Sequence, residues 1–265
     1  MRVGHQTYSW EMLGDKWRGS PDDILDAVAA AGYEGVEFAN SMIGDYWERP
    51  KHFEQALAKR GLKLAAFAYA RAGFTDPATC DDDMAGAEKA LRFAAHFSVV
   101  LGLGGPSSPT RDGYEEKLGH ACRFYNEVAA RGKKLGVPVA LHPHSHHTSL
   151  VLTGEEYDRF LAATEGSGAL FNPDTGHILR GGQDVLACCR RHAGRIVHVH
   201  CKDVDAQGHW QPMGRGICDF SALVGWLGEI GYRGWLIVEE ESDLVWSDLA
   251  GAMAQNRKYL RSLGC

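Results

Sequence analysis

Histidine and acidic residues gather at four places in the second half of the chain. The run LHPHSHH at residues 141–147 holds four histidines in six consecutive positions. It is followed by FNPDTGHI at 171–178, IVHVHCKD at 196–203 and WLIVEEES at 235–242. Imidazole nitrogens and carboxylate oxygens are ligands suited to Mn, Co, Zn or Fe, and mixed sites of this kind leave positions open for a substrate. The residue types therefore indicate a divalent-metal site.

Each run follows a short apolar stretch of the length of a β-strand. The apolar pattern predicts eight strands, at 3–8, 35–38, 63–69, 98–103, 137–141, 169–172, 196–201 and 235–239. Helical patterns lie between them, at 21–31, 52–60, 82–97, 114–135, 154–164, 183–192, 220–230 and 247–262. Eight alternating pairs in 265 residues predict an α/β fold, a (β/α)8 TIM barrel that forms a single domain over residues 1–265.

An open doubly wound sheet is the weaker alternative. The GLGG at 102–105 is followed by Pro106 and a loop, so it does not open a helix as a dinucleotide fingerprint does. In a barrel, functional residues lie at the carboxyl ends of the strands. We therefore expect the four runs to converge on one rim.

Composition limits the classes of partner. A formal net charge of −6 without a long Lys/Arg block gives no footprint for nucleic acid or for an anionic membrane. The apolar runs are only as long as strands, and the N-terminal residues lack the features of a signal peptide. Seven cysteines without CxxC spacing indicate reduced thiols. We expect a cytoplasmic protein that acts on a small molecule, and the sequence leaves a homo-oligomer open.

Alternation along the strands selects particular side chains. His142 and His144 share a face at the end of the fifth strand, and either of them could be its metal ligand. The later strands deliver Asp174, His200 and Glu239 to the same rim. Structural readings also exist: Asp174 could simply cap a helix, and the three glutamates at 239–241 could be a solvated strand end. We expect the remaining histidines of the run, at 146 and 147, to be loop residues outside the site.

The order and spacing of several motifs resemble one superfamily. GYEGVEF at 32–38, LHPH at 141–144, DTGH at 174–177, HVHCKD at 198–203, MGRGICDF at 213–220 and GYRGWLIVEE at 231–240 look like the xylose-isomerase-like barrels, which include sugar isomerases and epimerases. The inosose dehydratases, which act on 2-keto-myo-inositol in inositol catabolism, are the branch that the chain resembles most. The resemblance covers most of the chain and is more specific in its second half.

The resemblance implies a barrel with one divalent cation, commonly Mn, Co or Mg, with Zn also open. It implies that the metal ligands are Asp174, His200 and Glu239, that His177 binds substrate and that Lys202 contacts a substrate oxygen. Most isomerases of the superfamily place a glutamate at the end of strand five, where this chain has His142. The histidine-rich end followed by threonine is similar to inosose dehydratases, although the connection between HVHCKD and MGRGICDF is shorter than we expect for them.

These residues predict proton chemistry next to a carbonyl. A divalent ion that chelates a ketone and its neighbouring hydroxyl stabilises the enediolate left by proton removal. His142 or His144 can act as the base, and the imidazolium can then protonate a departing hydroxyl. Dehydration and isomerisation or epimerisation both remain open, with Glu239 also assigned to the catalytic set.

Other residues and other functions are weighed in the same way. Glu37, Trp10 and Arg215 are predicted to contact substrate. Each also has a structural alternative: Glu37 could form an ion pair inside the barrel, Trp10 could pack at the rim, and Arg215 could be a surface turn residue. A three-zinc endonuclease of the same barrel would need histidines where this chain has Tyr69 and Leu103. A barrel that binds sugar without catalysis is the remaining alternative, against which the intact set of four candidate ligands counts.

Overall fold

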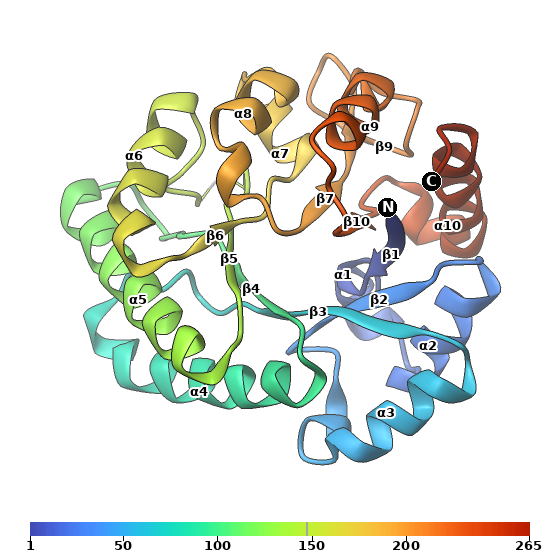
Figure 1. Ribbon diagram of the computed structural model, residues 1–265, viewed down its shortest axis with the longest axis horizontal. Coiled ribbons are helices and arrows are strands. Elements are labelled where there is room, and N and C mark those ends of the chain that lie inside the picture. Colours follow the sequence, from blue (N-terminus) through green and yellow to red (C-terminus); the bar gives the residue numbers. More distant parts are fainter. Residues whose placement is uncertain (147) are drawn as a thin grey trace. The chain divides into compact units, whose positions relative to one another are not determined.

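The computed structural model describes residues 1–146 and 148–265, and this chain divides into two units. The first unit contains Met1–Ala65 and Val199–Cys265, and the second contains Ala66–His198. Strand β3 (Lys63–Tyr69) leads from the first unit into the second. Both units are built from parallel strands and the helices that follow them, coloured along the chain in Figure 1.

The first unit has four parallel strands, which pair in the order β2, β1, β10, β7. The strands are β1 (Arg2–Gln6), β2 (Gly35–Ala39), β7 (Val199–Cys201) and β10 (Trp235–Val238). A short antiparallel pair, β8 (Asp203–Val204) with β9 (Trp210–Gln211), follows β7. The helices are α1 (Tyr8–Met12), α2 (Pro21–Ala30), α3 (Pro50–Lys59), α9 (Phe220–Glu229) and α10 (Leu244–Ser262).

Local sequence signals explain where these helices begin and end. The backbone N–H of Ser20 donates to Asp23 Oδ2 at 2.7 Å, and Pro21 occupies the first turn of α2. Gly32 and Gly231 have φ angles of 81° and 70° after α2 and α9, the left-handed conformation that stops a helix. Every residue of β2 and β10 is buried, as expected for parallel strands covered by helices.

The second unit carries the other strands of the predicted set, in the order β3, β4, β5, β6. After β3 these are β4 (Val100–Gly104), β5 (Val139–His142) and β6 (Leu170–Phe171). The helices are α4 (Cys80–Phe97), α5 (Tyr114–Leu135), α6 (Gly154–Thr164), α7 (Thr175–Arg180) and α8 (Val185–Arg191). In Figure 1 the long helices α4 and α5 lie on the outer side of β4 and β5.

All eight predicted strands are therefore present, each followed by a helix at or near the predicted residues. The pattern missed two short helices, α1 with five residues and α7 with six, and the hairpin β8–β9, whose strands have two residues each. Elements this short carry too few residues for a hydrophobic period to be visible. Within the described residues, we find no helix with the length and apolar character needed to cross a membrane.

Candidate active site

In the first unit, buried acidic and basic side chains stand at the ends of three strands. Glu37 lies in β2, His200 lies in β7, and Glu239 follows β10 directly. These three side chains are at most 6% exposed. A buried charge is stable only when it is paired, so their mutual contacts decide the electrostatics of this end of the unit.

His200 lies between two carboxylates. Its Nδ1 donates to Glu239 Oε2 at 2.7 Å, and its Nε2 donates to a carboxylate oxygen of Glu37 at 3.0 Å. Burial alone would lower the pKa of His200, but the charges and hydrogen bonds of Glu37 and Glu239 outweigh it and raise the pKa from 6.5 to about 10. The two carboxylates therefore favour the imidazolium form of the ring.

Lys202 adds a second cation to this cluster. Its Nζ donates to Glu241 Oε1 at 2.5 Å and lies 3.3 Å from Glu239 Oε1. The ammonium also lies 4.8 Å from the centre of the Trp210 ring, which the β8–β9 hairpin supplies. Nearby Tyr8 has a pKa raised to about 12, first by burial and then by Glu241 and Glu239. The first unit thus holds two cations among three carboxylates, out of contact with bulk water.

In the second unit, one histidine and one aspartate come together. His142 is the last residue of β5, and its Nε2 lies 3.6 Å from Asp174 Oδ2. The other oxygen of Asp174 accepts the backbone N–H of His177 at 2.8 Å and caps α7. The capping role considered from the sequence is therefore present, and it leaves the second oxygen directed toward His142.

His177 is the centre of a group of histidine rings. Ring centroids of His142, His144 and His146 lie 5.8, 6.1 and 5.3 Å from that of His177. The backbone N–H of Ser145 donates to His177 Nδ1 at 3.0 Å, and the Ser145 hydroxyl lies 2.8 Å from the same atom. Because Nδ1 accepts a hydrogen bond, the ring proton is on Nε2. His177 can therefore act as a donor to an oxygen.

Trp10 and Arg215, which were also predicted to contact substrate, lie in the surroundings expected from their structural alternatives. Trp10 is 5% exposed in α1, with its ring centroid 5.6 Å from that of His5 in an edge contact, which agrees with the packing alternative. Arg215 is exposed in a turn whose neighbours Gly214 and Gly216 donate their backbone N–H groups to Asp203 Oδ2, both at 2.9 Å. The turn that carries Arg215 is thus fixed from inside the unit by a buried carboxylate.

Sequence reasoning missed several members of these clusters. Ser145, Glu241 and Trp210 were not predicted to take part, although Ser145 and Glu241 lie inside quoted motifs. His146 was predicted to be a loop residue outside the site; it lies in the loop, but its ring packs against those of His144 and His177. The prediction for His147 falls outside the described residues. The run at residues 144–147 consists of polar residues only. It therefore lacks the alternation of apolar and polar positions that would show which side chains face inward.

Comparison with known proteins agrees with these motifs. The family model described as the xylose isomerase-like TIM barrel matches residues 25–263. The rhizopine catabolism protein MocC of Rhizobium meliloti is 31% identical over 259 residues, which cover 84% of this chain and 75% of MocC. Inosose dehydratase of Geobacillus kaustophilus is 26% identical over 279 residues, covering 91% of this chain and 88% of that enzyme.

Solved structures show the same fold at lower identity. The IolI protein with a bound zinc atom has a TM-score of 0.81 at 15% identity and covers 99% of this chain and 98% of its own. The 3-keto-D-glucoside 4-epimerase YcjR of E. coli has a TM-score of 0.79 at 16% identity, with 99% of each chain covered. The named relatives include dehydratases and epimerases, which confirms the expectation of an enzyme. The chain belongs to the xylose isomerase-like TIM barrel family.

Proposed function

We propose that the protein uses one divalent metal ion to remove a proton next to the carbonyl of a keto-sugar or keto-cyclitol. Dehydration of the inosose dehydratase type is the outcome that we favour, with isomerisation or epimerisation as the alternative. The observation that carries the proposal is the approach of a nitrogen and a carboxylate oxygen, His142 Nε2 and Asp174 Oδ2, at 3.6 Å.

This separation fits two ligands of one metal ion. It is longer than a hydrogen bond, whereas nitrogen and oxygen ligands that each lie about 2.0–2.2 Å from a metal are separated by roughly 3 Å in octahedral geometry and up to roughly 3.6 Å in tetrahedral geometry. In the first unit, His200 and Glu239 add a nitrogen and a carboxylate oxygen at strand ends. From these strand-end positions we propose the ligand set His142, Asp174, His200 and Glu239, with Mn, Co or Mg as the metal and Zn as a further candidate.

Glu37 has a supporting role in this proposal. A histidine that binds a metal through one nitrogen usually donates its other N–H to a carboxylate, which fixes the ring and its tautomer. Glu37 is in hydrogen-bond contact with His200 Nε2, so His200 can present Nδ1 to a metal while Glu37 holds the ring. We therefore assign Glu37 to orienting His200, in place of the substrate contact predicted from the sequence.

The remaining side chains bind the substrate and move its proton. The metal, when bound, would polarise the carbonyl as a Lewis acid. His144, or His142 if it is not a ligand, would take the proton from the carbon next to the carbonyl. His177 would donate its Nε2–H to a substrate oxygen. Lys202, held by Glu241 and Glu239, would contact a second oxygen.

The fate of the abstracted proton decides between the two outcomes. An imidazolium that protonates a departing hydroxyl gives loss of water. Return of a proton to the neighbouring carbon gives isomerisation, and its return to the same carbon from the opposite face gives epimerisation. Two findings favour dehydration: histidines occupy the end of strand five, and several similar curated proteins are named inosose dehydratase. Arg215 and Trp10 stay in the proposal as substrate contacts to be tested by mutation.

Proton NMR in deuterated water tests the proposal directly. The Mg²⁺-loaded protein is mixed with 2-keto-myo-inositol. Loss of a ring hydroxyl with formation of an enolised diketone would support dehydration. Deuterium uptake into a rearranged, fully hydroxylated sugar would support isomerisation or epimerisation. No change in this substrate or in a panel of keto-hexoses, together with saturable sugar binding, would replace the enzymatic proposal with a binding function.

A further inference from the structure

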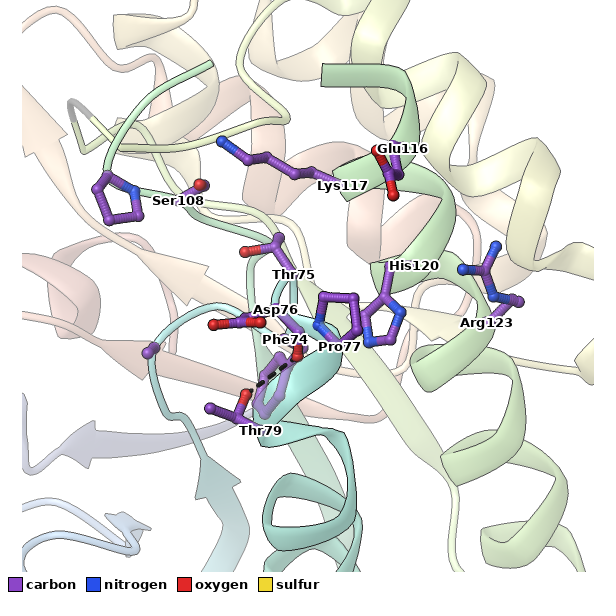
Figure 2. Close-up of a pocket in the computed structure, with 12 residues that line it drawn as sticks. Phe74, Thr75, Asp76, Pro77, Thr79, Ser108, Glu116, Lys117, His120 and Arg123 are labelled. Atoms are coloured by element: carbon purple, nitrogen blue, oxygen red, sulfur yellow. Dashed lines mark hydrogen bonds between the residues drawn. The ribbon is translucent and has the colours of Figure 1, made fainter. Parts of the chain in front are cut away.

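The second unit contains a cleft that the candidate active site does not use. It has a volume of about 420 Å³, within the size range of small-molecule sites. Residues of the segment 72–79 form one wall, Ser108 and Pro109 form another, and the first three turns of α5 close the third side (Figure 2). All of these residues lie within a single unit.

The wall formed by residues 72–79 is rigidly held. Phe74 has a φ of 59°, a left-handed conformation that costs a bulky residue of order 1–3 kcal/mol. Packing maintains it, because the Phe74 ring stacks on Phe124 with centroids 4.3 Å apart and an interplanar angle of 9°. Thr75 Oγ1 also donates to Ser107 O at 2.7 Å. Contacts within the unit therefore fix this wall of the cleft.

One side of the cleft presents a row of basic side chains. Lys117, His120 and Arg123 are spaced by three residues along α5, which places them on one face of the helix. Figure 2 shows them in sequence along that helix, with the His120 ring beside Pro77. Lys117 Nζ donates to Thr110 O at 2.9 Å and to Thr110 Oγ1 at 3.4 Å, which leaves one of its three hydrogens. Among the described residues, Arg123 forms no ion pair with an acid.

Two acids also line the cleft and balance the formal charges of Lys117 and Arg123, so the attraction for an anion rests on Arg123, which has no acidic partner among the described residues. Asp76 Oδ1 accepts the N–H of Ala78 at 2.8 Å and caps the turn Pro77–Thr79. Glu116 is exposed in the first turn of α5. The positive end of the α5 dipole adds to the potential of the basic side chains.

The rest of the lining is largely apolar. Ala72, Phe74, Pro77 and Pro109 contribute hydrocarbon surface. We propose that this cleft binds a small organic anion: a carboxylate or phosphate monoester on a flat apolar body, with the anion at Arg123 and the body against the prolines. This site stands apart from the proposed function and does not depend on it.

His120 supplies the probe for a test. Protein labelled with ¹³C-histidine is titrated with benzoate, phenyl phosphate, inorganic phosphate and benzylamine, and the His120 signal is assigned with His120→Gln. We expect benzoate or phenyl phosphate to shift this signal saturably, with a dissociation constant on the order of millimolar, as suits so few atoms. The tighter of the two identifies the anionic group.

Two variants locate the anion. Arg123→Gln should weaken binding by about tenfold or more, because a charge-assisted hydrogen bond is lost. Lys133→Gln removes an exposed charge near the other end of α5 and should leave binding unchanged. Absence of saturation, equal binding of benzylamine, equal binding of inorganic phosphate (an adventitious ion only), or an unchanged Arg123→Gln would each overturn the proposal.

Discussion

The strand ends of the two units carry different chemistry. In the first unit, His200 and Lys202 are held among three buried carboxylates by direct ion pairs. In the second unit, histidine rings pack around His177, with Asp174 as the acid that both caps α7 and approaches His142. One end is a charged network on strands, and the other is a set of aromatic donors and acceptors carried largely by a loop.

This difference indicates a division of labour. Strand-borne groups that are locked by ion pairs are suited to holding a metal in a fixed geometry, since precise positions need rigid supports. Loop-borne imidazoles can be changed without disturbing the strands, so they are suited to selecting a substrate and moving its proton. Variants of the proposed metal ligands and variants of the loop-borne imidazoles should therefore affect different measured quantities.

Loss of a proposed ligand should have the largest effect. Glu239→Gln and Asp174→Asn should each lower metal affinity by more than about 100-fold and abolish activity, because each removes a charged oxygen ligand. Each variant is dialysed against a trace of chelator, and its metal content is then measured by mass spectrometry. This measurement checks the predicted loss of metal for a ligand from each unit.

A matched control separates ligation from simple loss of charge. Glu241→Gln also removes a buried carboxylate that pairs with Lys202, but Glu241 is not a proposed ligand. It should keep metal bound, and circular dichroism should confirm that all three variants are folded. Full metal occupancy in Glu239→Gln or Asp174→Asn would remove that residue from the ligand set.

Glu37→Gln should have an intermediate effect. Gln keeps the shape of the side chain but holds His200 less strongly, so metal affinity should fall by about 10–100-fold, as for other residues that orient a ligand. Competition with a fluorescent chelator measures the change. A change in KM alone, with metal affinity intact, would return Glu37 to the substrate contact predicted from the sequence.

A pH-dependent loss of stability should come from the first unit. Burial lowers the pKa of His5 from 6.5 to about 4, against a smaller opposing effect of its hydrogen bond to the Gln6 carbonyl. As pH falls below 6.5, the unfolded chain binds a proton that the folded chain accepts only near pH 4. The contribution of His5 to the free energy of unfolding should therefore fall between these values, by about 2 kcal/mol from pH 7.5 to pH 5. His200, whose pKa is raised to about 10, acts in the opposite direction over the same interval, so the contribution of His5 is read from the difference between the protein and a His5 variant.

Urea unfolding at the two pH values measures this loss. His5→Gln cannot take up the proton, so on going from pH 7.5 to pH 5 its free energy of unfolding should change by about 2 kcal/mol more favourably than that of the unchanged protein, whatever its stability at pH 7.5. Equal pH dependence in the two proteins would mean that His5 is already protonated in the folded state.

The fold was predictable because its signals repeat. Each predicted strand has a short apolar run, and each long helix has an amphipathic pattern. Errors of a few residues at the ends of single elements therefore did not change the predicted architecture. The family match over residues 25–263 confirms the barrel prediction. The prediction that the whole chain is one domain stays a prediction.

Side-chain partnerships were much harder to predict. Alternation along strand five was expected to align His142 with His144, but β5 ends at His142, and a loop brings His144 beside His177. The contact of Ser145 with His177 joins residues 32 positions apart. Such contacts depend on how a loop folds back over the start of a helix. The spacing of apolar residues along the sequence carries no information about this. Types and positions of candidate residues could be read from the sequence, but their partners could not.

Ser145→Ala should have a modest effect confined to the substrate. It removes one of two groups at His177 Nδ1, so the ring loses part of its orientation. KM should rise by about two- to tenfold, as for a neutral hydrogen bond, with metal content unchanged. Ser149→Ala is the control, because the Ser149 hydroxyl is also buried but bonds only to the backbone, at Val151. Loss of metal in Ser145→Ala would contradict the division of labour.

The smallest effect is expected at His146. This residue is either a loop residue outside the site, as predicted from the sequence, or a member of the histidine group around His177. Its ring lies 4.9 Å from that of His144 and 5.3 Å from that of His177, yet no proposed step uses it. His146→Gln should change kcat/KM by less than about fivefold, because the loss of one half-buried ring contact is worth about 0.5–1 kcal/mol. His142→Gln, at a proposed ligand in the same run, should instead reduce metal binding. A large loss of kcat in His146→Gln with metal retained would make His146 part of the proton-transfer machinery and extend the site into the loop.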